Sequence, residues 1–267
     1  MKKRIASSAV LGFLLCSAVT APAQSVQDVV ELDLVPGWRT ETGSHMAGLR
    51  ITLAPGWKTY WRVPGESGIP PTLTFAQSTN VHSVRIGWPR PGVFESYGLE
   101  TIGYADEVVL PLEIKPTDAS TKMNVSVRAS IGVCRDICLP VEILFSSDIA
   151  PGAGAHEPLI SDAIARIPKT VQSQTARCAV EPIRDGLQIT AYLPVPAQGG
   201  TERVFLEPSR SDVWTSPSKV SREGDTITAV ADLVPPEAKP FALNRSQMRF
   251  TVLGDKGALE MFGCQAD

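Results

Sequence analysis

The sequence lacks the residue patterns of several functional classes. It has three histidines in 267 residues, and they stand apart at positions 45, 82 and 156, so no zinc-ligand spacing exists. We find no Ser/His/Asp arrangement, phosphate-binding glycine loop or paired-carboxylate motif. The formal net charge is only -3, which does not favour a nucleic-acid surface or a basic membrane-binding patch. We therefore expect no metal ion, no cofactor and no nucleic-acid partner.

Long apolar runs are also scarce, and the single one lies at the N-terminus. Basic residues at 2–4 precede an apolar run over 9–19, and Ala-Pro-Ala at 21–23 places small residues where a signal peptidase reads them. The run is short for a bilayer span. We predict a signal peptide over residues 1–23 that is cleaved after Ala23, and therefore a periplasmic protein.

Cysteine is scarce as well, with five in the chain. Cys16 falls within the predicted signal peptide, and it follows two leucines, which does not favour a lipoprotein. The other four are Cys134, Cys138, Cys178 and Cys264. Outside the cytoplasm cysteines are normally paired, and four thiols permit three pairings.

Proline (22) and glycine (21), by contrast, are plentiful, and neither suits long helices. Short alternating apolar stretches recur, with Pro-Gly pairs at 36–37, 55–56, 64–65 and 91–92 between them, which we interpret as turns. This pattern predicts an all-β protein built from β-sandwiches. The clearest strand candidates are 49–53, 108–114, 123–131, 187–192, 203–206, 226–231 and 248–253.

The chain divides at a segment of linker composition. Residues 150–156 are rich in alanine and glycine, and apolar residues over 159–167 then follow helical spacing. We expect a first domain over 24–150, a linker with a short helix over 151–170, and a second β-sandwich domain over 171–267.

Cys134 and Cys138 flank the polar turn Arg-Asp-Ile. In one extended strand their α-carbons would lie about 13 Å apart at ~3.3 Å per residue. A disulfide needs these atoms within roughly 7 Å. A closed pair therefore requires the chain to reverse over 135–137, as a three-residue hairpin loop does.

The size of the loop favours a switch over a structural link. Closing so few residues restrains the unfolded chain by only ~2 kcal/mol, whereas closing the stretch from Cys178 to Cys264 gives ~4.6 kcal/mol. A hairpin tip is exposed, as thiol–disulfide exchange requires, and Arg135 beside Cys134 would favour a thiolate. From spacing alone, a structural or metal-binding role for the pair stays open.

Three separated motifs, in order, resemble the N-terminal periplasmic domain of the DsbD and ScsB family. They are GWKTYWRVPGESGIPP at 56–71; WPRP at 88–91, with GY at 103–104 and VLPL at 109–112 after it; and VCRDICLP at 133–140. The resemblance covers roughly residues 29–146. The CxxxC spacing resembles the ScsB branch, and the second half of the chain looks more loosely like the second domain of that branch.

The resemblance implies two immunoglobulin-like sandwiches and a redox-active pair, Cys134 and Cys138, at a hairpin. It implies a transmembrane DsbD- or CcdA-like electron donor and periplasmic disulfide-containing substrates, with cytochrome c biogenesis or copper tolerance as the process served. We expect the donor to be a separate protein. The family's cap loop corresponds to 94–98, so Phe94 and Tyr97 are candidate cap residues.

Other residues are predicted to belong to the site or to lie outside it. Tyr60 and Arg62 match family positions near the cysteines, and we expect Tyr60 to support the site. For Cys178 and Cys264 we favour a structural disulfide across the second domain, with a second redox pair as the alternative. We expect a protein-disulfide reductase component. The rivals are a copper-binding protein that uses the same thiols, with His45 as a further candidate ligand, and a redox-inert scaffold.

Overall fold

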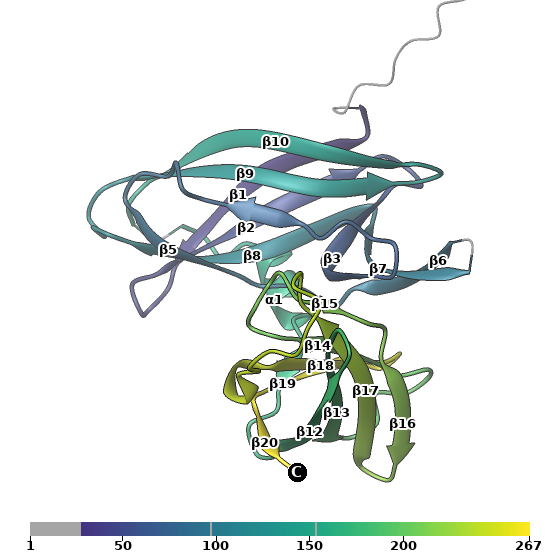
Figure 1. The fold of residues 1–267 in the computed structure, drawn as a ribbon. Coiled ribbons are helices and arrows are strands. Elements are labelled where there is room, and N and C mark those ends of the chain that lie inside the picture. Colours follow the sequence, from purple (N-terminus) through teal and green to yellow (C-terminus); the bar gives the residue numbers. More distant parts are fainter. Residues whose placement is uncertain (1–27, 97, 153) are drawn as a thin grey trace, which may run out of the picture.

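A computed structural model of the chain describes residues 28–96, 98–152 and 154–267. The predicted signal peptide lies outside the described residues. The chain forms two β-sandwiches, one above the other in Figure 1, with the helix α1 (Pro158–Ala165) between them in sequence. The all-β prediction and the two immunoglobulin-like sandwiches are confirmed. Among the described residues, no helix is both long and apolar enough to cross a membrane.

The first sandwich packs a four-stranded sheet against a six-stranded one. The first sheet has the order β1 (Val30–Arg39), β2 (His45–Leu53), β8 (Glu107–Pro116) and β5 (Val81–Ile86). The second has the order β10 (Cys138–Ile149), β9 (Met123–Cys134), β3 (Lys58–Gly65), β7 (Leu99–Ala105) and β6 (Gly92–Ser96), with β4 (Thr72–Thr74) beside β9. All these strand pairs are antiparallel.

The core of the first sandwich follows from the period-two pattern of its strands. Every second residue of a strand faces the same side of its sheet. In β9, Val125, Val127 and Ala129 are fully buried in the core, together with Leu49 of β2 and Trp61 of β3. The tryptophans at 57 and 61 are both buried in this core.

Two of the predicted turns lie within strands instead, 36–37 in β1 and 64–65 at the end of β3. Strand β1 continues through Pro36 and Gly37, with a register shift between Val35 and Trp38 that marks a bulge. Gly37 has φ 64°, and a Cβ there would lie 1.9 Å from the Met46 carbonyl oxygen, so the bulge needs glycine.

The second sandwich repeats the architecture with fewer long strands. One sheet has the order β11 (Lys169–Thr170), β19 (Ala258–Phe262), β18 (Arg249–Leu253) and β14 (Arg203–Glu207). The other has the order β15 (Trp214–Thr215), β17 (Thr226–Val234), β13 (Gly186–Pro194), β12 (Ala176–Ile183) and β20 (Cys264–Ala266), with β16 (Lys219–Glu223) also on β17. A 3-10 helix, η2 (Arg245–Gln247), precedes β18.

The helix α1 belongs to the first sandwich by its contacts. Ile160 and Ala163 are fully buried and cluster with Val109 of β8. A Cβ at Gly48 would lie 2.9 Å from the Ile160 side chain, so the glycine lets the helix approach the sheet closely. The sequence predicted apolar helical spacing to 167, and the helix ends at Ala165 with Arg166 as its cap.

Alternate side chains of β14 dock the second sandwich onto the first. Phe205 packs edge-on against Trp61, with 5.2 Å between ring centroids. Arg203 forms a bidentate ion pair with Glu100 of β7. Val204 and Leu206, which point the other way, are buried in the core of the second sandwich.

Arg62 of β3 makes the most buried polar contact between the sandwiches. Its Nε lies 2.9 Å from Oε1 of Glu207, and its Nη2 donates to the Thr251 hydroxyl at 3.0 Å and to Glu260 at 2.5 Å. The Arg62 and Glu260 side chains are each 10% exposed. The guanidinium also lies 4.0 Å from the ring centre of Trp61. A buried cation between two carboxylates fixes how the sandwiches meet.

Candidate functional site

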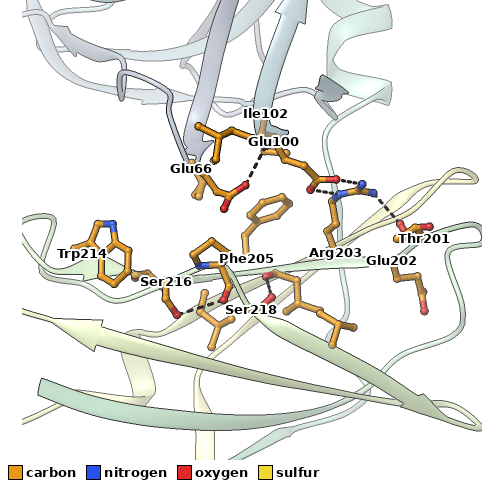
Figure 2. A pocket seen from close by; sticks show the side chains of 18 residues that line it. Glu66, Glu100, Ile102, Thr201, Glu202, Arg203, Phe205, Trp214, Ser216 and Ser218 are labelled. Atoms are coloured by element: carbon orange, nitrogen blue, oxygen red, sulfur yellow. Dashed lines mark hydrogen bonds and ion pairs between the residues drawn. The ribbon is translucent and has the colours of Figure 1, made fainter. Parts of the chain in front are cut away.

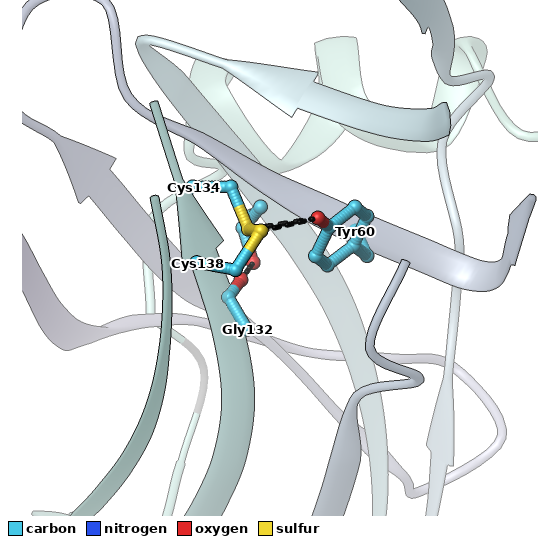
Figure 3. Close-up of a disulfide and its surroundings, with 5 residues drawn as sticks. Tyr60, Gly132, Cys134 and Cys138 are labelled. Carbon is cyan, nitrogen blue, oxygen red and sulfur yellow. Dashed lines mark hydrogen bonds between the residues drawn. A yellow bond between two sulfur atoms is a disulfide. The ribbon is translucent and has the colours of Figure 1, made fainter. Parts of the chain in front are cut away.

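The cysteine pair lies at a tight hairpin between β9 and β10. Cys134 ends β9, Cys138 begins β10, and the two are direct partners in the strand register. The Arg135 N–H donates to the Ile137 carbonyl at 3.1 Å and closes the three-residue loop. The α-carbons are 4.1 Å apart and the sulfurs are bonded, as Figure 3 shows. The hairpin inferred from spacing is present.

The two cysteines differ in exposure. Cys134 is 8% exposed and therefore buried, whereas Cys138 is exposed. The residues between them are exposed too, and Ile137 shows 64% of its surface to solvent. The disulfide is therefore open to solvent on the side of Cys138.

Tyr60 lies against both sulfurs, as Figure 3 shows. Its hydroxyl oxygen is 2.7 Å from Sγ of Cys134 and 3.3 Å from Sγ of Cys138. Its ring crosses β9 at Gly132, where a Cβ would lie 2.8 Å from the ring. The neighbouring Thr59 hydroxyl donates to the Gly132 carbonyl at 2.9 Å and ties the two strands together. Glycine at 132 thus makes room for the tyrosine.

Burial raises the pKa of Tyr60 above its ordinary value of 10.0. The phenol therefore keeps its proton at neutral pH and can donate a hydrogen bond to sulfur. Because a donor stabilises a thiolate more than a thiol, Tyr60 favours ionisation of a reduced cysteine beside it.

Lys58 is a site residue that we did not single out from the sequence. It is the register partner of Cys134 and lies two residues before Tyr60, so the three share one face of the sheet. Its ammonium lies 4.7 Å from the centre of the Phe94 ring. Alternation places Lys58 and Tyr60 on one face, but the sequence alone does not give the register with Cys134.

Of the two predicted cap residues, Phe94 is described and Tyr97 lies outside the described residues. The segment expected to be a loop is largely strand β6, which pairs with β7. The Phe94 ring folds back over Gly92, where a Cβ would lie 3.2 Å from the ring. Phe94 thus contacts Lys58, the register partner of Cys134.

The side chains of Arg135 and Arg62 contact other groups than the cysteines near which the sequence placed them. The Arg135 Nε donates to Asp136 at 3.0 Å, and its guanidinium lies 5.2 Å from the ring centre of Trp57. Its charge is thus directed to a carboxylate and an aromatic ring. Arg62 turns to the second sandwich and not to the cysteines.

The second cysteine pair has a different setting. Cys178 of β12 and Cys264 of β20 are bonded across a parallel strand pair, with 5.8 Å between α-carbons and a sequence separation of 86. Cys178 is fully buried and Cys264 is 9% exposed, both within the core of the second sandwich.

The histidine weighed as a copper ligand lies in the other sheet. His45 of β2 is buried and its Nε2–H donates to the Pro36 carbonyl. Within the described part of the chain, no group of three or more His, Cys, Asp or Glu residues is arranged to hold a metal ion.

Known proteins match this chain in fold and, for its first half, in family. One solved structure, the crystal structure of the N-terminal periplasmic domain of ScsB from Proteus mirabilis, superposes with a TM-score of 0.63 at 23% sequence identity. The match covers 92% of this chain and 97% of that one, so both sandwiches share its fold. No curated protein matches the chain.

By fold and site, the first sandwich is an immunoglobulin-like β-sandwich domain that carries a disulfide across one hairpin. Residues 20–147 match the family model described as the N-terminal part of thiol:disulfide interchange protein DsbD. The first sandwich therefore matches this family model over nearly its whole length, as the three sequence motifs indicated.

Proposed function

We propose that the chain exchanges thiols and disulfides through Cys134 and Cys138. The observation that carries this proposal is the accessible disulfide at the tip of the β9–β10 hairpin, with a tyrosine hydroxyl on its sulfurs. Exchange requires an attacking thiolate to reach a sulfur in line with the sulfur–sulfur bond. The exposed side of Cys138 permits this approach.

We assign different roles to the two sulfurs, and their difference in exposure supports this assignment. In the reduced protein the Cys138 thiolate attacks a substrate disulfide, which forms a mixed disulfide and releases one substrate thiolate. The Cys134 thiolate then attacks Cys138 sulfur, closes the intramolecular bond and releases the second substrate thiolate. Two electrons pass from the dithiol to the substrate, and Tyr60 stabilises Cys134 as the thiolate that resolves the intermediate.

The family match of the first sandwich supports a proposal for the compartment, the reductant and the substrates of this exchange. We propose that the protein works in the periplasm after removal of residues 1–23, and that a transmembrane DsbD- or CcdA-like protein reduces it. Its substrates are periplasmic proteins that hold disulfides. In this proposal residues 24–150 form the redox domain, 151–170 the linker and 171–267 the second domain.

Redox titration of the protein tests the proposal. The protein is equilibrated with dithiothreitol or glutathione buffers, and free thiols are alkylated and located by mass spectrometry. We expect the Cys134–Cys138 bond to reduce at a potential above the roughly -300 mV of structural disulfides, with Cys178–Cys264 still closed.

Trapping of mixed disulfides supplies the second readout. A Cys134→Ser variant keeps the exposed Cys138 and should accumulate mixed disulfides with periplasmic proteins, while Cys138→Ser should trap far fewer. If the hairpin disulfide resists reduction as strongly as Cys178–Cys264 and neither variant traps a protein, the exchange function is wrong and a redox-inert scaffold replaces it.

A further inference from the structure

A groove opens where the two sandwiches meet. It has a volume of about 590 Å³ and lies between the end of β3, the first half of β7, and strands β14 to β16. Figure 2 shows Ile102 and Glu66 entering from the first sandwich, and Phe205 and Trp214 from the second. Trp214 is 59% exposed, although its indole borders an apolar space. A large exposed aromatic beside an apolar groove is typical of a binding site.

One wall of the groove is a strand edge. Strand β14 pairs with β18 and has no strand partner on its other side within the described chain. The Gly254 N–H bonds the Gly257 carbonyl and closes the β18–β19 hairpin, which fixes the alternation of hydrogen bonds along β18. The backbone N–H and C=O groups of Val252 and Phe250 therefore form hydrogen bonds with β19.

This alternation determines which backbone groups of β14 face outward. The backbone N–H and C=O groups of Thr251 and of every second residue from it point towards β14, where those of its register partner Phe205 pair with them. The N–H and C=O groups of Val204 and Leu206 therefore point the other way, to the edge without a strand partner. The Ser218 hydroxyl donates to the Val204 carbonyl. The Val204 N–H and the N–H and C=O of Leu206 have no hydrogen-bond partner among the described residues. Val204 and Leu206 are each only 3% exposed.

Buried backbone donors and acceptors rarely stay unpaired. An apolar small molecule would fill the groove but leave these groups without partners. An extended peptide satisfies them, because its own N–H and C=O groups alternate with the same spacing, and its side chains enter the apolar space.

The groove also has a charge preference. Its arginine, Arg203, is paired with Glu100, and Glu202 is paired with Arg222. Glu66 accepts the Glu100 N–H at 3.0 Å, but no Lys or Arg of the described chain forms an ion pair with it. A carboxylate left without a cation favours a basic side chain in the occupant.

We propose that this groove binds an extended polypeptide segment, apolar with a basic residue, which adds to β14 as a further strand. The segment belongs to a partner protein. The site is separate from the disulfide, so the proposal does not depend on the exchange function.

A synthetic probe tests the proposal on the full-length oxidised protein. The probe is a fluorescein-labelled peptide, acetyl-Lys-Val-Thr-Val-Thr-Val-amide, and its binding is followed by fluorescence anisotropy. A copy with N-methylated amides keeps the side chains but donates no hydrogen bonds. We expect the parent peptide to bind about tenfold more tightly than the methylated copy. Amide hydrogen exchange at Val204 and Leu206 should slow when the parent peptide is bound.

Matched variants locate the binding. We expect Trp214→Ala and Glu66→Gln each to weaken binding, while Phe262→Ala, which removes an aromatic side chain 52% exposed outside the groove, leaves it unchanged. Thermal unfolding confirms that each variant is folded. Equal binding of both peptides, equal effects of the three substitutions, or no binding up to about 1 mM peptide overturns the proposal. Binding of the dye 1-anilinonaphthalene-8-sulfonate in place of the peptide would also overturn it and assign the groove to small apolar ligands.

Discussion

The two sandwiches each hold one disulfide, and they hold it in opposite ways. In the first, the bond closes a loop at the surface, links residues four apart and has one exposed cysteine. In the second, the bond joins strands 86 residues apart and lies in the core. One bond is reachable and restrains the chain little, whereas the other is enclosed and restrains it greatly.

The comparison suggests a division of roles within one chain: the surface disulfide suits exchange, and the core disulfide suits stability. The surface bond has a hydroxyl donor, Tyr60, beside its sulfurs. The core bond is surrounded by apolar side chains of its sandwich. A protein that must open one disulfide while keeping its fold benefits from placing the other beyond the reach of reductants.

The largest expected effect comes from removing the core disulfide. We expect Cys178→Ser with Cys264→Ser to lower the free energy of unfolding of the second sandwich by ~4.6 kcal/mol, since the unfolded chain regains the freedom of a long loop. Urea unfolding followed by circular dichroism measures this loss. The matched variant, Cys134→Ser with Cys138→Ser, should cost ~2 kcal/mol or less. Equal costs for the two pairs would abolish the contrast between them.

The contact between the sandwiches comes next in magnitude. We expect Arg62→Met to weaken docking by ~3 kcal/mol, because Glu207 and Glu260 stay largely buried and keep only the longer contacts to Arg249, at 3.9 and 4.0 Å. Limited proteolysis across the linker should accelerate, while each sandwich keeps its own exchange-protected core.

Arg203→Met is the control for this prediction. It removes a more exposed ion pair, with Glu100 43% exposed, and should change proteolysis much less. If both substitutions act alike, Arg62 is not the principal contact between the sandwiches.

The sequence predicted the architecture well because its strands show period-two alternation. Six of the seven strand candidates fall within strands, and the seventh, 248–253, begins one residue before β18. The three-residue hairpin followed from the reach of the chain between Cys134 and Cys138. Pro36 and Gly37 were read as a turn, and that prediction is wrong. They form a bulge because β1 continues pairing with β2 on both sides of them.

The parts of the site that the sequence did not reveal depend on register and on contacts between sandwiches. Lys58 comes beside Cys134 only through the pairing of β3 with β9, which no local pattern encodes. The family resemblance placed Arg62 near the cysteines. Its partners, Glu207 and Glu260, lie 145 and 198 residues away along the chain.

A smaller effect separates reactivity from stability within the first sandwich. We expect Tyr60→Phe to slow alkylation of the reduced hairpin thiols about tenfold at pH 7, because a hydrogen bond to a charged group contributes ~1.5 kcal/mol to thiolate stability. Iodoacetamide kinetics across a pH series measure the shift in thiol pKa.

Tyr104→Phe supplies the matched control. Tyr104 is also a buried tyrosine of this sandwich, but its hydroxyl donates to the Pro89 carbonyl at 2.7 Å. Its loss should lower thermal stability and leave the alkylation rate unchanged. If Tyr60→Phe affects stability alone, Tyr60 is a packing residue and not part of the redox site.

The smallest effect is a difference in acid sensitivity between the sandwiches. Burial lowers the pKa of His45 below its ordinary value of 6.5, with the nearby Arg39 charge acting in the same direction. The folded first sandwich therefore prefers a neutral His45, and the unfolded chain takes up its proton at a higher pH. This contribution to stability is fully present above pH 6.5 and is lost as the pH falls through the lower folded value. Tryptophan fluorescence reports mainly on the first sandwich, which holds Trp38, Trp57, Trp61 and Trp88, so urea midpoints at pH 7 and pH 5 measure the loss. We expect His45→Gln to reduce the shift between the two midpoints and His82→Gln, at an exposed position of β5, to leave it intact. An unchanged shift in His45→Gln would place the acid sensitivity in another group.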